Sequence, residues 1–122
     1  MLAAYDAKWL ILRTTADILP PDSLRFHQIP WPILEPAHCV EQMTKGAIRR
    51  FLEHPSRLSV PRGKTREEVL RWVVKRELLR WHPDKFHSQV LSKAKPDQRS
   101  WISEVAAAVT RALTEIMAEL AH

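Results

Sequence analysis

The residues best suited to chemistry in this chain of 122 amino acids are grouped around His82-Pro83-Asp84. An imidazole and a carboxylate flank a proline there, and the proline restricts the backbone between them. Together with His87 they offer donor atoms for a metal ion. Pro83 and the lack of a Cys or His pair at ligand spacing count against that use. We therefore expect no metal site and no bound cofactor.

The single thiol is the second candidate for chemistry. Cys39 follows His38, but nothing nearby in the sequence indicates an environment that would activate a thiol nucleophile. We expect that the protein is not an enzyme. Since one cysteine cannot form an internal disulfide, and no apolar run is long enough to span a bilayer, we expect a cytoplasmic or nuclear protein without a membrane partner.

The stretch from Thr65 to Phe86 must position His82-Pro83-Asp84. Thr65 and Glu68 form the pattern of a capping box, which predicts where a helix begins. Pro83 lacks an N–H and disfavours the helical conformation at His82, so we expect the helix to end there. Between these points apolar residues recur at helical spacing: Val69, Leu70, Trp72, Val73, Val74, Leu78, Leu79 and Trp81.

This predicted helix is basic, like the chain as a whole. Lys and Arg number 19 against 14 Asp and Glu, a formal net charge of +5 that favours acidic partners. Two interpretations of the cations stay open: a docking face, or an ordinary solvated helix face with local glutamate partners. The cations of the stretch are Arg66, Arg71, Lys75, Arg76 and Arg80.

The string Arg80-Trp81-His82-Pro83-Asp84-Lys85 resembles the signature of J domains, the DnaJ-like co-chaperone module. The resemblance implies a module that binds a heat shock protein 70 chaperone and stimulates its ATPase. It also implies that Asp84 perturbs the chaperone's linker contacts, while His82 and Pro83 set the shape of the loop. The partner-binding residues implied are His82, Pro83, Asp84, Lys85, Arg71, Lys75, Arg76 and Arg80.

A second resemblance covers more of the chain. Tyr5-x-x-x-Trp9, Leu24-Arg25-Phe26 with Ile29-Pro30-Trp31-Pro32, and the string from Leu79 to Phe86 are similar to the C-terminal region of NF-kappa-B inhibitor-like proteins. This likeness implies a J-like module with its own N-terminal strap. It also implies an association with nuclear regulation.

The remaining elements predict an all-α, J-domain-like antiparallel helical hairpin. We expect helices over residues 2–17 and 38–53, and a long final helix that Asp97 caps and whose alanines 106–108 permit close packing. Residues 85–95 are expected to form a loop with a turn near 88–91. Prolines in residues 18–36 predict an ordered strap that lies along the core with Trp31 buried. Residues 1–37 would pack on a domain formed by 38–122.

Glu77 departs from the J-domain pattern, which places a leucine five residues before the histidine. Either a nearby cation neutralises Glu77, or the helix is rotated to bury Trp72, Val73 and Leu79 instead. All five tryptophans are expected to serve the core. We expect a monomer.

Two other functions remain open. One is a degenerate J-like scaffold in a nuclear regulatory or RNA-processing complex, docking partners through Trp31 or the N-terminal helix. The other, less favoured, is nucleic-acid binding by the basic helix, which would weaken steeply with salt.

Overall fold

The computed structural model describes residues 3–15, 18–55 and 58–120. In these ranges the chain forms five α-helices and no strand, which confirms the all-α prediction. The α-helices are α1 (Ala3–Thr14), α2 (Lys45–Glu53), α3 (Arg66–Arg80), α4 (Pro83–Gln89) and α5 (Arg99–Leu120). Short 3-10 turns occur at Phe26–Gln28, Val40–Gln42, Leu91–Lys93 and Pro96–Gln98.

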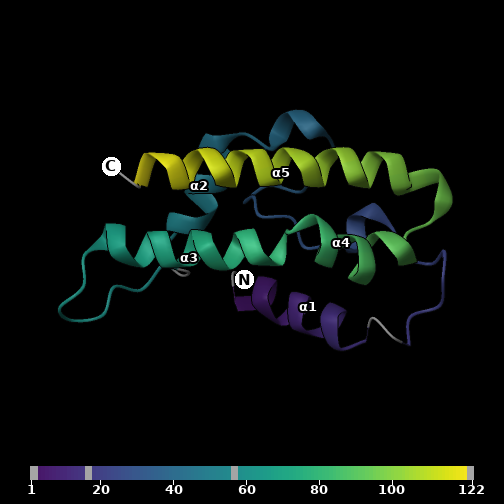
Figure 1. Cartoon of the computed structure of the whole chain (residues 1–122), viewed down its shortest axis with the longest axis horizontal. Helices are drawn as coiled ribbons and strands as arrows, with labels where there is room; N and C mark the ends of the chain where they lie inside the picture. Colours follow the sequence, from purple (N-terminus) through teal and green to yellow (C-terminus); the bar gives the residue numbers. More distant parts are fainter. Residues whose placement is uncertain (1–2, 16–17, 56–57, 121–122) are drawn as a thin grey trace.

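Helices α3 and α5 pack together as an antiparallel pair (Figure 1). At one end the guanidinium of Arg71 donates to the carbonyl oxygen of Leu120, and at the other the Thr110 hydroxyl donates to that of Trp81. The small residues Ala106 and Ala108 are buried, so α5 can approach its neighbours closely.

Helix α2 packs against both α5 and α3, but it is shorter than residues 38–53. Its start is set by Thr44, whose hydroxyl accepts from the Ala47 N–H at 3.1 Å. Residues Val40–Gln42 form a separate 3-10 turn ahead of this cap. The predicted start of the helix was therefore wrong, because the apolar spacing continues across the break.

The prediction of a loop over residues 85–95 was also wrong for residues 85–89, which belong to helix α4. Helix α3 ends at Arg80, and α4 begins at Pro83 with His82 as its N-cap. A proline at the first helical position has no N–H to leave unsatisfied, and its fixed φ suits a helix start. Pro83 thus prevents α3 from continuing and is also the first residue of α4.

Asp97 does not directly precede the final helix. It lies in the 3-10 turn Pro96–Gln98, and α5 begins at Arg99. The Arg99 guanidinium instead reaches back to Asp22, at 2.6 Å, and so fastens the start of α5 to the N-terminal segment.

The proline-rich segment 18–36 lies along the helices, and Trp31 is buried, as expected. Leu24 forms a parallel bridge with Ala94, supported by the bond from the Lys95 N–H to the Leu24 carbonyl at 2.8 Å. The Trp9 indole donates to the Pro30 carbonyl at 3.0 Å, which joins the segment to α1.

Helix α1 buries Tyr5, Trp9 and Leu12 and leaves Leu10 and Ile11 exposed. Of the helix expected over 2–17, Leu2, Ala16 and Asp17 lie outside the described residues. Buried apolar residues from Tyr5 to Leu120 form one cluster. The division of the chain at residue 37 stays a prediction. Within the described ranges, no helix has the length and apolar character needed to cross a membrane.

The cap of α3 gives the first testable prediction. The Thr65 hydroxyl accepts from the Glu68 N–H at 3.1 Å. Replacing it by alanine leaves an N–H of the first turn without this acceptor, so Thr65→Ala should lower the free energy of unfolding by about 1 kcal/mol. Urea denaturation measures this, and Thr65→Ser, which keeps an acceptor oxygen, should remain close to wild type. Equal losses in both variants would contradict the capping role.

Candidate functional site

The His82-Pro83-Asp84 segment forms the exposed corner between α3 and α4. The Asp84 N–H donates to His82 Nδ1 at 3.2 Å, so the imidazole caps the helix that Pro83 opens. The Asp84 side chain is 94% exposed, and its Oδ2 lies 3.9 Å from His82 Nδ1. The carboxylate is therefore presented to solvent on the first turn of a helix, whose N-terminal dipole favours negative charge.

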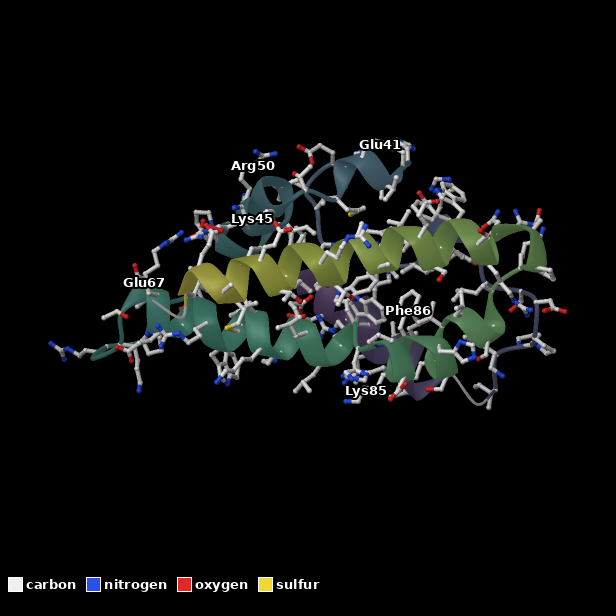
Figure 2. The ribbon with its side chains drawn as sticks, turned by 45° about the horizontal axis from the view of Figure 1, so that its top comes forward. Glu41, Lys45, Arg50, Glu67, Lys85 and Phe86 are labelled. Carbon is white, nitrogen blue, oxygen red and sulfur yellow. The ribbon has the colours of Figure 1, made fainter. Side chains whose placement is uncertain are left out.

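Two buried aromatic side chains hold this corner from either side. Trp81 is 1% exposed and Phe86 is 4% exposed, whereas the four residues between them are exposed. Figure 2 shows Phe86 lying between the ribbons of α4 and α5, while Lys85 points away from α5. The corner is thus short, and both of its ends are fixed in the core.

These two rings belong to a larger stack of aromatic side chains. Trp81 stacks on Phe86 and on Trp31, each at 5.3 Å between ring centroids. Trp31 in turn stacks on Phe26, and Phe26 on Trp101 at the start of α5, at 4.7 and 3.8 Å. Offset stacking adds to the burial energy of such rings. The proline-rich segment therefore supplies the middle of a stack that connects α5 to the exposed corner.

The four cations of α3 that the J-domain resemblance implicates in partner binding divide into two pairs. Lys75 and Arg76 are exposed, and they lie on the side of α3 away from the core. Arg71 and Arg80 are bound within the molecule: Arg71 donates twice to the last carbonyl of α5, at 2.9 and 3.3 Å, and the Arg80 side chain is 9% exposed. Only the first pair is free to meet a partner.

Arg80 forms the ion pair that neutralises Glu77. Glu77 is 1% exposed, its Oε2 accepts from Arg80 Nη1 at 2.8 Å, and its Oε1 accepts from the Tyr5 hydroxyl at 2.5 Å. Arg80 Nη1 also donates to Asp6 of α1, at 3.2 Å. Of the two arrangements considered for Glu77, neutralisation by a nearby cation is the one found. Trp72 and Leu79 are exposed, so the rotated helix was wrong.

Burial and the adjoining Glu77 carboxylate raise the pKa of the Tyr5 hydroxyl well above its usual value. For Arg80, burial acts to lower the pKa, but the interactions with Glu77, Tyr5 and Asp6 together outweigh it, and the pKa is raised. Tyr5 therefore stays a neutral hydrogen-bond donor and Arg80 stays a cation. This combination satisfies a carboxylate in the core from two different helices.

The structure corrects the role expected for one tryptophan. Trp72 is 57% exposed and so is not a core residue, whereas Trp31 is buried as expected. Trp72 and Leu79 are seven residues apart and share a helix face with Lys75, opposite the buried residues Leu70 and Val74. Placing every residue of α3 on a helical wheel would have found this exposed pair from the sequence.

The two other candidates for chemistry are a metal site near His82 and the Cys39 thiol. Within 3–15, 18–55 and 58–120, no three His, Cys, Asp or Glu side chains are grouped so as to hold a metal ion. The Cys39 thiol is half-buried and contacts the Gln42 side-chain oxygen at 3.9 Å.

Comparison of the chain with protein-family models, with curated proteins and with solved structures found no match in any of the three.

The ion pair predicts that Arg80 and Arg76 differ in their importance for stability. Arg80→Met removes the cation beside buried Glu77, and should lower the free energy of unfolding by about 3 kcal/mol or more. Arg76→Met, a matched change on the exposed side of the same helix, should lie within about 0.5 kcal/mol of wild type. Urea denaturation measures both, and the double variant Glu77→Leu/Arg80→Met should recover part of the loss. Equal effects at both arginines would exclude a special role for the pair.

Tyr5 is the only tyrosine of the chain, so its ionisation can be followed by ultraviolet absorbance without overlap from another. Its pKa is raised in the folded state, so the folded protein holds the proton to a higher pH than the unfolded chain does. The protonated Tyr5 hydroxyl therefore contributes to the stability of the folded protein. This contribution is complete below the unfolded-state tyrosine pKa of about 10, and it is lost as pH rises towards the folded-state pKa. The phenolate signal should therefore appear with unfolding, and Tyr5→Phe should flatten the alkaline loss of stability. Titration near pH 10 while circular dichroism stays native would contradict this.

Proposed function

We propose that this chain is a J-domain-like module that binds a heat shock protein 70 chaperone and stimulates its ATP hydrolysis. The observation that carries the proposal is the exposed Asp84 carboxylate at the corner that follows basic helix α3, a helix that packs against α5. The likeness of the sequence around His82-Pro83-Asp84 to the J-domain signature supports the same function.

The docking contact would be made by Lys75, Arg76 and Lys85, with Asp84 at the tip. These three cations are exposed, so they can meet an acidic surface at little cost in rearrangement. Complementary charge of this kind speeds the encounter and fixes orientation more than it adds affinity. Arg71 and Arg80 would contribute indirectly, because their side chains hold α3 against α5 and α1.

The chain itself would make or break no covalent bond. It would act by binding the hydrolysis-competent state of the chaperone more tightly than the resting state, since only differential affinity shifts such an equilibrium. Asp84 would compete for charged partners in the chaperone's linker region. A corner fixed by Trp81 and Phe86 suits this role, because a preorganised carboxylate loses little freedom on binding.

Single-turnover ATP hydrolysis by a heat shock protein 70 chaperone tests the proposal. Wild-type protein should accelerate hydrolysis, and Asp84→Asn should abolish the acceleration while urea denaturation stays unchanged, because the carboxylate is 94% exposed. Asp97→Asn is the matched control, since Asp97 is also an exposed aspartate in a short helical turn, and it should retain full stimulation.

The charge-reversed variant Lys75→Glu/Arg76→Glu should weaken the stimulation, with the larger effect at low ionic strength. Absence of stimulation by wild-type protein across chaperones from cytoplasm and nucleus would overturn the proposal.

The exposed side chains of Leu10 and Ile11 favour a second candidate, a J-like scaffold that holds a nuclear protein complex through α1. Here Leu10→Asp should abolish association with the complex, while Asp84→Asn should leave it intact. The opposite pattern would favour the co-chaperone.

A further inference from the structure

The outer face of α3 carries two large apolar side chains that have no cover in the molecule. Trp72 is 57% exposed and Leu79 is 60% exposed. They lie two helical turns apart on one line, about 10 Å along the helix axis. Single exposed apolar residues are common on protein surfaces, but contiguous apolar patches mark interaction sites, and Trp72 and Leu79 lie on one line of the same helix face.

Cations occupy the space between these two apolar residues. Lys75 and Arg76 are exposed on the same side of the helix, and the Arg76 guanidinium lies over the Trp72 ring, 4.8 Å from its centroid. This contact holds the indole and the charge together as one surface feature. Trp and Arg are also the side chains that most often dominate binding energy at interfaces.

A groove extends the surface beside Trp72. It has a volume of about 470 Å³ and lies between the start of α3 and the preceding loop. Its lining residues are Ser59, Pro61, Lys64, Glu68, Val69 and Trp72. Glu68 is held there by Thr65 at 3.3 Å and by Lys64 at 3.9 Å, so its carboxylate has a fixed place in the groove. The groove is large enough to receive one apolar side chain.

We propose that the outer face of α3 binds an acidic amphipathic helix of a partner protein. Two apolar residues of that helix, seven apart, would pack on Trp72 and Leu79, and its acidic residues would pair with Lys75 and Arg76. This is the helix-in-groove mode of recognition, in which apolar anchors recur every three or four residues.

The charge pattern favours such a helix over a phosphate surface. Glu68 lines the groove, and Glu67, its neighbour in the sequence, lies at the N-terminal end of α3 (Figure 2). A membrane of anionic lipids or a nucleic-acid backbone would meet these acids with repulsion. A helix can place its acids opposite Lys75 and Arg76 only, and leave neutral residues opposite the glutamates.

The surface runs from Trp72 towards the Asp84 corner. Trp72 precedes Arg80, the last residue of α3, by about 12 Å along the axis. Lys75 and Arg76 also belong to the docking contact of the co-chaperone proposal, so the two proposals share these cations, whereas Trp72 and its groove belong to this inference alone. The variants Asp84→Asn and Trp72→Ala therefore distinguish the two proposals.

Fluorescence anisotropy with a labelled synthetic peptide tests the inference. The probe is an amphipathic helical peptide with leucines at positions i, i+3 and i+7, flanked by glutamates, and its counterpart carries lysines in place of the glutamates. The acidic peptide should bind and the lysine peptide should not. Trp72→Ala should weaken binding by about tenfold or more, and Lys75→Glu/Arg76→Glu should weaken it with a loss of salt dependence.

Three variants serve as controls. Leu10→Ala removes an equally exposed leucine from α1, Arg13→Glu reverses an exposed charge there, and Asp84→Asn removes the carboxylate of the corner; all three should bind like wild type. Because Trp72 is exposed, Trp72→Ala should unfold in urea close to wild type, which separates lost binding from lost structure.

Several results would overturn the inference. They are equal binding of the acidic and lysine peptides, no binding of the acidic peptide, and binding that Trp72→Ala leaves unchanged. Vesicles of anionic phospholipid provide a further arm: if they bind through Trp72 while the peptide does not, the partner is a membrane surface and the protein-helix proposal is wrong.

Discussion

The buried carboxylate of Glu77 is the constraint on which the rest of the structure depends. A charge inside the core requires a cation and donors close by, because its desolvation is costly. Arg80 provides the cation from the same helix, but the Tyr5 hydroxyl comes from α1. Helix α1 is therefore held at the C-terminal half of α3, where Trp9 also packs edge-on against Trp81. The Tyr5–Glu77 hydrogen bond and the Trp9–Trp81 contact therefore fix α1 against the end of α3, next to the exposed corner.

The corner and the core are coupled through aromatic rings. Trp81 and Phe86 each belong both to the stack and to the few residues around Asp84, so the position of the carboxylate follows from the packing. The proline-rich segment takes part because Trp31 and Phe26 stand between Trp81 and Trp101. A site supported by packed side chains of several elements is held more precisely than one on a free loop.

Strong local patterns explain which parts were predictable from the sequence. The apolar period of α3 and α5 and the Thr65 cap locate the hairpin, and the cluster of prolines with apolar residues identifies a buried segment. Pro83 was ambiguous, because a proline both ends one helix and suits the first position of the next. The role of Arg71 could not be read from periodicity, since its partner Leu120 lies far away along the chain. The pairing of Arg80 with Glu77 is local and could be anticipated, but the contact of Arg80 with Asp6 could not. The size and apolar character of Trp72 favoured burial, but Trp72 lies on the outer face of α3 and is exposed.

The pairing of Tyr5 with Glu77 joins residues 72 positions apart in the chain, and this affects how the protein is made. Helix α1 leaves the ribosome before α3, and its partners in α3 are synthesised some seventy residues later. Until then Tyr5, Trp9 and Leu12 have no core to enter, and such exposed apolar side chains make a nascent chain prone to aggregate. Docking of α1 on α3 therefore cannot be completed until Glu77 and Arg80 have been synthesised.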